Sequence, residues 1–266
     1  MAERVTVTVE NQIAVVSLNR PDKYNGLDMP MFEQIAAAAK RLRKDRTVRA
    51  IILRGEGKAF CSGLDVKSVT ANPLNFARLL IKPGRRIANL AQEVGYLWRE
   101  VPAPVIAVTQ GVCFGGGFQI ALGADFRFST KDCEFSIMES KWGLIPDMSL
   151  TVTLRELTSI DTAKELTMTG RRFSATEAKS MGLISRICDD PMAEALSFAE
   201  ALSLRSPDAI AASKLLFNRS WNATDKAALD WETRLQKKVI ARYNQRAAVS
   251  QNAGDDPRPF RDRRSF

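Results

Sequence analysis

The sequence of 266 residues contains no histidine. Without imidazole the chain has neither a Ser-His-Asp triad nor a Cys-His pair, and the usual zinc-hydrolase sites are excluded as well. Acid–base chemistry must then depend on Asp, Glu, Lys or Tyr side chains. Carboxyl groups are therefore the leading candidates for any proton transfer.

Cysteine is scarce and lacks the spacing of a redox or metal-binding motif. The four residues, Cys61, Cys113, Cys133 and Cys188, form no Cys-x-x-Cys pair and lie mostly in apolar segments, which is typical of reduced, buried thiols. The sequence also has no apolar run long enough to span a bilayer and no recognisable secretion signal at its start. We therefore expect a cytoplasmic protein with no membrane partner.

Acidic residues are outnumbered by basic ones. Asp and Glu total 30 against 39 Lys and Arg, which gives a formal net charge of +9 and a pI near 9.6. Such a balance attracts polyanions, but the basic residues are spread along the chain without an RNA-binding aromatic motif. This distribution favours a solvated basic surface over a nucleic-acid site, and it is compatible with a substrate that carries several phosphates.

The order of predicted elements divides the chain into three parts. Strands interleaved with helices predict an α/β core domain over residues 1–190, and the 45% of hydrophobic residues can fill its core. An all-helical region is expected over residues 191–252, and the charged, proline-containing residues 253–266 are expected to be extended or disordered. The helical segments are Met192–Leu204, Pro207–Ser220 and Thr224–Tyr243.

Local patterns predict particular elements. Two β-branched runs within Val5–Leu18 predict a hairpin, and Asp28 is expected to cap the helix that follows it. Apolar periodicity predicts a helix over Arg85–Glu100, and Ser174-Ala-Thr-Glu177 is a capping box. Val66–Lys82 has weak periodicity, which fits a mobile loop or irregular helix over a ligand, or an ordinary surface connection.

The most informative stretch is Gly111–Gln119, in which three successive glycines follow a predicted strand and open a predicted helix. Bare backbone N–H groups at such a turn can stabilise a negative oxygen. A second glycine-containing turn, Phe60–Asp65, follows another apolar strand and can supply a second donor. Taken alone, such a glycine turn is more often a packing device or a nucleotide-binding loop than an oxyanion site. The spacing fits neither the dinucleotide-binding nor the Walker phosphate-binding pattern, so a different ligand is indicated.

Several ordered motifs resemble the crotonase superfamily, also called the enoyl-CoA hydratase/isomerase family, over nearly the whole chain. These motifs are Asn19–Asn25, Lys58–Asp65, Pro104–Val108, Gly115–Gly117, Phe135–Glu139, Gly143–Pro146, Leu166–Gly170 and Ala178–Leu183. The resemblance implies the α/β crotonase fold, a superhelical core of stacked ββα units with a C-terminal helical region for trimerisation. It also implies an acyl-CoA thioester substrate, a homotrimer or dimer of trimers, and no metal or redox cofactor.

By motif position, the resemblance assigns binding roles to residues of the two glycine turns. The backbone N–H groups of Leu64 and Gly116 match the two oxyanion donors of the family. Ser62, Leu64, Asp65 and Gly116 lie where the family contacts the acyl-CoA, and Lys23 is a further candidate near the CoA phosphates. In this family the thioester oxygen becomes enolate-like while side chains above it move protons.

Three side chains are candidates for the proton chemistry. Glu139 matches a catalytic glutamate of hydratases and several isomerases. Asp147 matches an aspartate of dienoyl-CoA isomerases, although a helix N-cap is its ordinary use. Gln119 stands where hydratases carry a second glutamate; an amide cannot take a proton from water, so a structural or orienting role is favoured for it.

The pattern favours an isomerase that shifts a double bond of an enoyl-CoA or dienoyl-CoA by carboxylate proton transfer. One alternative is a 2-enoyl-CoA hydratase that uses Glu139 alone. Another is a CoA-binding or RNA-binding protein that keeps the fold without the chemistry, because fold does not determine function. The acyl chain is expected to be apolar, from Phe76, Leu79, Leu80 and Trp142 near the predicted pocket.

Overall fold

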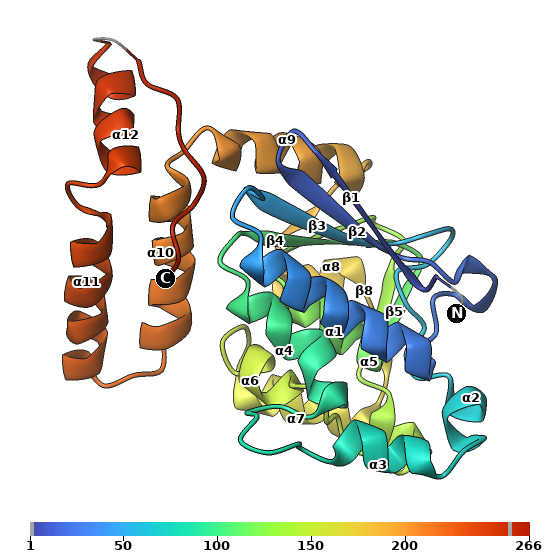
Figure 1. Ribbon diagram of the computed structural model, residues 1–266. Helices are drawn as coiled ribbons and strands as arrows, with labels where there is room; N and C mark the ends of the chain where they lie inside the picture. Colours follow the sequence, from blue (N-terminus) through green and yellow to red (C-terminus); the bar gives the residue numbers. More distant parts are fainter. Residues whose placement is uncertain (1–2, 255–256) are drawn as a thin grey trace.

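The computed structural model describes residues 3–254 and 257–266 of the chain (Figure 1). A six-stranded sheet forms its centre, and only the first strand pair is antiparallel. The strands, in spatial order, are β1 (Val5–Glu10), β2 (Ile13–Leu18), β3 (Ala50–Gly55), β4 (Val105–Thr109), β6 (Phe126–Ser129) and β9 (Arg186–Ile187). The predicted hairpin is confirmed, since β1 and β2 form an antiparallel pair in which Val5 lies opposite Leu18 and Glu10 lies opposite Ile13.

A second, smaller sheet lies beside the first, and strands of the two sheets together form ββα units with the helices. It contains β5 (Val112–Phe114), β7 (Glu134–Ser136) and β8 (Arg172–Ser174). The unit β4–β5–α5, with α5 at Gly116–Leu122, places one strand in each sheet before the helix begins. This is the predicted crotonase arrangement, and it delivers the glycine turn to the rim between the two sheets.

Helices cover both faces of the main sheet (Figure 1). On one face, α1 (Met29–Lys44) contacts β1, β2 and α4 (Leu90–Glu100), while α9 (Pro191–Ser203) contacts β3, β4 and β6 on the other. The remaining helices are α2 (Val66–Thr70), α3 (Leu74–Leu80), α6 (Leu150–Leu154), α7 (Ile160–Thr169), α8 (Ala175–Ser180), α10 (Pro207–Ser220), α11 (Asp225–Val239) and α12 (Tyr243–Ala253), with short 3₁₀ helices η1 (Pro21–Lys23) and η2 (Glu139–Trp142).

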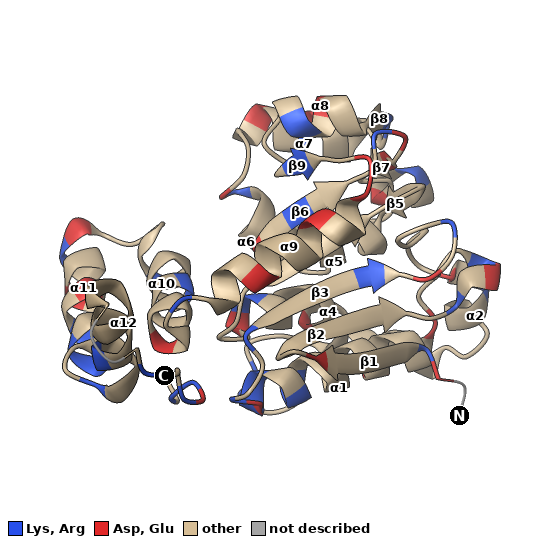
Figure 2. Cartoon of the chain, turned by 90° about the horizontal axis from the view of Figure 1, so that it is seen from above, with Lys and Arg blue, Asp and Glu red and all other residues tan. Residues whose placement is uncertain are grey.

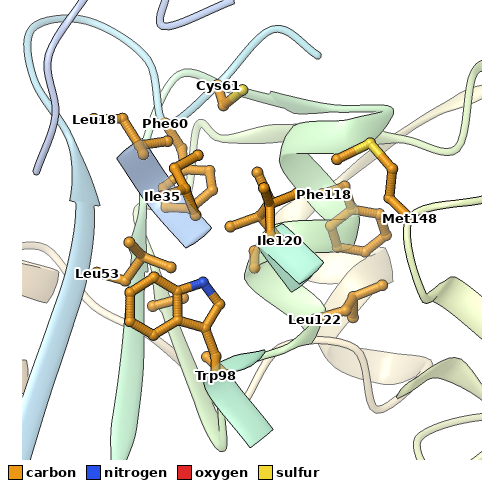
Figure 3. Close-up of a cluster of buried hydrophobic side chains, with 14 of the residues drawn as sticks. Leu18, Ile35, Leu53, Phe60, Cys61, Trp98, Phe118, Ile120, Leu122 and Met148 are labelled. Atoms are coloured by element: carbon orange, nitrogen blue, oxygen red, sulfur yellow. The ribbon is translucent and has the colours of Figure 1, made fainter. Parts of the chain in front are cut away.

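The larger hydrophobic core lies between the sheet and helices α1, α4 and α5. Figure 3 shows Trp98, Phe118 and Ile120 at its centre, all without exposed surface, and Met148 at the edge. Removing one such aromatic side chain typically costs about 3–5 kcal/mol of stability. The core therefore fixes α4 and α5 firmly beneath the cavity described below.

Capping residues set the start of several helices. Asp28 accepts a hydrogen bond from Met31 N–H at the start of α1, and Ser174 and Glu177 form the predicted box at α8. The predicted helix from Arg85 is too long, because a capping box at Asn89 begins α4 at Leu90. Ile87, placed on the apolar face by its spacing, is 73% exposed.

The segment between β3 and α4 is more regular than its sequence indicated. Val66–Lys82 contains the two short helices α2 and α3 rather than an irregular loop. Both pack beside the cavity, since Val66 of α2 and Leu79 of α3 line it. This segment therefore forms a wall of the candidate site.

The C-terminal part differs from expectation in two places. Helix α9 packs on the main sheet through its own hydrophobic cluster, so the helical extension begins after Ser203 rather than at residue 191. The expected helix Thr224–Tyr243 is broken into α11 and α12 by Ile240–Arg242, where Ala241 has φ of +59°. Propensity alone does not reveal either change, because both depend on packing.

Residues 257–266 form no helix or strand but are docked on the protein. Arg263 is 3% exposed, its N–H donates to Arg46 O over 3.1 Å, and Arg264 N–H donates to Asp208 over 2.7 Å. The tail is therefore extended and anchored between the core and the helical extension, while residues 255 and 256 lie outside the described part.

Positions of charged residues are spread over most of the chain (Figure 2). Lys and Arg appear on the core, on α11 and near the C-terminus, interspersed with Asp and Glu. Within the described residues, no helix is both long and apolar enough to cross a bilayer.

Candidate active site

A cavity of about 240 Å³ opens between the two glycine turns, α3 and the segment from η2 to α6. Its walls are largely apolar and include Phe76, Leu79, Leu80 and Trp142, as the sequence indicated. Polar and charged side chains in its lining belong to Ser62, Glu139 and Asp147. Leu64 and Gly116, from the two glycine turns, line it as well.

The backbone N–H of Leu64 is directed by a parallel bridge between Leu27 and Leu64. Leu27 N–H donates to Gly63 O over 2.8 Å, and Asp65 N–H donates to Leu27 O over 3.1 Å. In a parallel pair, the residue bracketed by these two bonds points its own N–H to the opposite side. Leu64 N–H is therefore turned away from Leu27 and left for another acceptor.

Gly116 begins α5, so its N–H lies in the first turn and has no partner within the helix. In the described part of the chain, neither Leu64 N–H nor Gly116 N–H donates to another protein group. The two turns are in contact: a Cβ added at Gly63, where φ is +91°, would stand 3.6 Å from the Gly116 nitrogen. Both turns therefore bring a backbone donor without a protein partner to the lining of the cavity.

Glu139 begins η2 and is half-buried at the cavity. Its Oε1 accepts a hydrogen bond of 2.5 Å from Gln119 Nε2, and its Oε2 is buried without a partner. Burial raises the pKa of Glu139, and the nearby Asp147 charge raises it further, against the lowering effect of the Gln119 bond. A carboxyl group with one committed and one free oxygen is suited to moving a proton.

Asp147 stands in the loop between η2 and α6, at the mouth of the cavity. Ser149, not Asp147, occupies the N-cap position of α6, so the ordinary capping use of Asp147 is excluded. Its side chain reaches water, yet burial by the surrounding atoms raises its pKa. Asp147 and Glu139 both line the cavity, so the two carboxyl groups share one site.

Gln119 is 1% exposed and lies behind Glu139 rather than in the cavity. Its Nε2 donates to Glu139, and its Oε1 accepts a hydrogen bond of 2.9 Å from Met148 N–H. Its amide therefore contacts the protein on both sides and does not line the cavity. The amide joins Glu139 to the loop that carries Asp147, which is the structural one of the two roles that the sequence left open.

The other predicted binding residues are less directly placed. Ser62 lines the cavity, but Asp65 does not: its carboxylate pairs with Arg20 over 2.8 Å and accepts Ser68 N–H over 3.0 Å. Lys23 is exposed outside the cavity, near Ser62 through its backbone oxygen. Asp65 therefore has a clear structural function in this turn.

Sequence reasoning missed Met148 and Arg20. Met148 is buried, lines the cavity and stands over Gly116, with its Sδ 2.6 Å from where a Cβ on Gly116 would be. Nothing in the spacing of Met148 distinguishes it from an ordinary core residue. Arg20 belongs to the Asn19–Asn25 motif, but its contacts become visible only in the folded chain.

Comparison with known proteins agrees with the geometry. The model of the family described as enoyl-CoA hydratase/isomerase matches residues 8–261. The chain belongs to the enoyl-CoA hydratase/isomerase family. Enoyl-CoA hydratase EchA19 of Mycobacterium tuberculosis is 31% identical, with 94% of this chain and 91% of that protein covered.

Two further similar proteins are an isomerase and a hydratase, the two activities in the family's description. The mitochondrial Delta(3,5)-Delta(2,4)-dienoyl-CoA isomerase of Rattus norvegicus is 30% identical, with 86% of this chain and 73% of that protein covered. The crystal structure of an enoyl-CoA hydratase from Bacillus anthracis has a TM-score of 0.88 at 25% identity, with 97% of this chain and 98% of that chain covered. This member of the enoyl-CoA hydratase/isomerase family is therefore an acyl-CoA-processing enzyme of the crotonase fold.

Proposed function

We propose that this enzyme shifts a double bond of an enoyl-CoA or dienoyl-CoA by proton transfer between carbons of the acyl chain. The observation that carries the proposal is the convergence of two free backbone donors and two carboxyl groups on one apolar cavity. The Gln119 amide hydrogen-bonds one of these carboxyl groups, that of Glu139. A second carboxyl group at position 119 would instead suit the addition of water.

The proposed chemistry begins at the thioester oxygen, which accepts hydrogen bonds from Leu64 and Gly116 N–H. Ionised Glu139 takes a proton from the carbon next to the thioester, and the electron pair of the broken C–H bond forms a dienolate. Protonated Asp147 then donates to the far end of the conjugated system, which completes the shift. The proton on Glu139 returns to Asp147 through solvent before the next turnover.

The test is turnover of 3-enoyl-CoA and 3,5-dienoyl-CoA by the wild type and by Glu139→Gln and Asp147→Asn variants. We expect isomerisation by the wild type and a loss of about 10²–10⁴-fold in kcat for Glu139→Gln, the usual contribution of a general base. A variant that carries both substitutions is the inactive reference. Wild-type turnover no higher than that of this double variant would refute the proposal. RNA or CoA binding without turnover would instead support the non-catalytic alternative.

A second candidate is hydration of 2-enoyl-CoA by Glu139 alone, which is favoured by the free Oε2 and the raised pKa of this residue. Gln119→Glu places a second carboxyl group beside Glu139 and restores the pair expected of hydratases. A faster hydration of 2-enoyl-CoA by this variant would show that Gln119 limits the hydration rate of the wild type. Wild-type hydration that exceeds isomerisation would favour the second candidate over the first.

We also propose that the chain assembles as a homotrimer or a dimer of trimers through its helical extension. Large apolar side chains are exposed there: Phe217, Trp221 and Leu229 are 57%, 64% and 60% exposed. Residues of this kind commonly mark interfaces. Light scattering after size-exclusion chromatography should show an assembly that Phe217→Ser with Trp221→Ser weakens; a wild-type monomer would contradict this proposal.

A further inference from the structure

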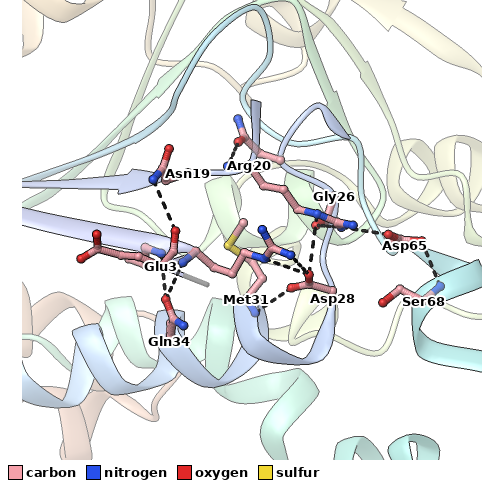
Figure 4. A network of polar contacts seen from close by, with 12 residues as sticks. Glu3, Asn19, Arg20, Gly26, Asp28, Met31, Gln34, Asp65 and Ser68 are labelled. Atoms are coloured by element: carbon pink, nitrogen blue, oxygen red, sulfur yellow. Dashed lines mark hydrogen bonds and ion pairs between the residues drawn. The ribbon is translucent and has the colours of Figure 1, made fainter. Parts of the chain in front are cut away.

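Arg20 lies at the centre of a polar network that joins the start of α1 to the start of α2 (Figure 4). Its Nη1 donates to Gly26 O over 3.0 Å and pairs with Asp65 Oδ2 over 2.8 Å. Its Nε lies 3.6 Å from Asp28 Oδ2. One guanidinium group therefore contacts two chain segments, residues 26–28 and residue 65.

These contacts surround the Leu27–Leu64 bridge that directs the Leu64 N–H. Gly26 and Asp28 flank Leu27 on one segment, and Asp65 follows Leu64 on the other. The bridge itself contains only two backbone hydrogen bonds, of 2.8 Å and 3.1 Å. A planar guanidinium with several donors in fixed directions is suited to holding the two segments in one register.

The network is well shielded and electrically balanced. The side chain of Arg20 is 10% exposed and that of Asp28 is 5% exposed. Burial by itself raises the pKa of Asp65, but hydrogen bonds from Ser68 N–H and Arg20 outweigh it, so the pKa lies below its ordinary value. Asp65 therefore stays ionised at neutral pH, and the Arg20 contact remains charge-assisted.

Arg4 supplies a natural comparison, because it also pairs with Asp28, over 2.9 Å, but contacts neither Asp65 nor Gly26 in the described structure. Loss of Arg4 would remove one partner of Asp28 and one positive charge. Loss of Arg20 would do the same and would also release the two segments on either side of the Leu27–Leu64 bridge.

We propose that Arg20 is a positioning residue that fixes the direction of the Leu64 N–H toward the thioester oxygen. The inference rests on the proposed oxyanion role of Leu64. Arg20 touches no reacting atom; it acts by holding residues 26–28 and 65 so that the bracketed amide keeps one orientation. Its loss should therefore weaken stabilisation of the enolate more than binding of the acyl-CoA.

The experiment compares the wild type with Arg20→Gln, Arg20→Lys and the matched control Arg4→Gln. Steady-state kcat and KM are measured with 3,5-dienoyl-CoA, and thermal unfolding is measured for each variant. Acetoacetyl-CoA serves as a second probe, because its enolate absorbs in the near ultraviolet and the enolate fraction reports oxyanion stabilisation without requiring turnover. The full-length enzyme is used throughout.

Removing an oxyanion donor typically costs about 10²–10³-fold in kcat, so misdirecting one should cost about 10–100-fold. We expect that loss for Arg20→Gln, with KM changed by less than about threefold and a lower enolate fraction. Arg20→Lys should recover part of kcat, because Lys keeps the charge without the planar fork. Arg4→Gln should keep the wild-type kcat, even if its unfolding temperature falls as much as that of Arg20→Gln.

Equal kinetic effects of Arg20→Gln and Arg4→Gln would overturn the inference, and so would a change confined to KM. If Arg20→Gln fails to fold, Arg20→Lys decides on the same criteria. A wild type that shows neither turnover nor enolate formation would refute the proposed function itself. A wild type that is active while the Arg20 variants match the control would refute only the role of Arg20.

Discussion

At the scale of single residues, the ionised form of Glu139 lowers the stability of the folded protein. Burial raises its pKa in the folded protein, with a further contribution from Asp147. A carboxyl group whose pKa is raised on folding favours the folded state below its unfolded pKa, and this contribution is lost as pH rises through the folded value. The ionised Glu139 that the proposed mechanism requires is thus a destabilising group near neutral pH.

Glu139→Gln should therefore unfold at a higher temperature than the wild type at pH 8, and this advantage should shrink toward pH 4. The amide keeps an oxygen for the Gln119 bond but has no charge to desolvate. Calorimetry at both pH values measures the difference. The exposed Glu134 is a suitable control position, since Glu134→Gln should give no such gain. A Glu139→Gln variant that is less stable at pH 8 would contradict this account.

Asp147→Asn tests the electrostatic link between the two carboxyl groups. Because the Asp147 charge raises the pKa of Glu139, its removal should move the titration of Glu139 to lower pH. The acid limb of kcat/KM, which reports the free enzyme, should shift in the same direction even where kcat is reduced. An acid limb that stays in place or moves to higher pH would show that Asp147 does not act on Glu139 through its charge.

At the scale of elements, the site depends on how closely α4 approaches α5. A Cβ on Gly95 of α4 would stand 2.8 Å from Met148 O and 3.2 Å from Gln119 O. A Cβ on Gly123, just beyond α5, would stand 2.2 Å from Gly95 O. Only glycine permits this approach, and the approach seats the backbone around Gln119 and Met148.

Gly95→Ala should separate α4 from this backbone and cost about 1–3 kcal/mol, as overpacking of a core usually does. Denaturant unfolding measures the loss of stability. Activity should fall beyond the effect of stability, because the shift disturbs the Gln119 bridge between Glu139 and Met148. Arg85→Ala, at an exposed position before α4, is the control, since it shortens a side chain outside the core and places no atom between α4 and α5. A Gly95→Ala enzyme with unchanged stability would contradict the packing argument.

Sequence patterns predicted elements best where the signal is local. The hairpin, the Asp28 cap and the Ser174–Glu177 capping box depend on neighbours within a few residues, and all three are confirmed. The start of α4 was misplaced because Asn89 with Gln92 caps the helix although apolar spacing continues upstream. The break after α11 was missed because it depends on how α12 docks.

At the scale of the whole molecule, Lys214 fastens the helical extension to the core. Its Nζ pairs with Asp125 over 2.7 Å and donates to Trp98 O and Ala103 O over 2.8 Å and 3.0 Å. The side chain is only 6% exposed. These contacts connect α10 to α4 through Trp98, to Ala103 just before β4, and to Asp125 just before β6.

Lys214→Met should destabilise the protein by about 1–3 kcal/mol, because it leaves the half-buried Asp125 carboxylate and the carbonyls of Trp98 and Ala103 without their donor. The extension should then detach more easily, so limited proteolysis near residues 204–206 should become faster. Lys226→Met, at an exposed position of α11, should leave both properties unchanged. A Lys214→Met protein as stable and as protease-resistant as the control would show that the pair does not hold the extension.

The sequence by itself determined the family and the glycine turns, because these follow from residue types at short, ordered spacings. It also singled out Glu139 and Asp147 as candidates for the proton chemistry. Only the tertiary structure decided that Gln119 lies behind Glu139, that Asp65 pairs with Arg20, and that α9 belongs to the core. These outcomes depend on contacts between segments far apart in the chain. Burial and hydrogen-bond partners arise from such contacts, and local patterns do not encode them.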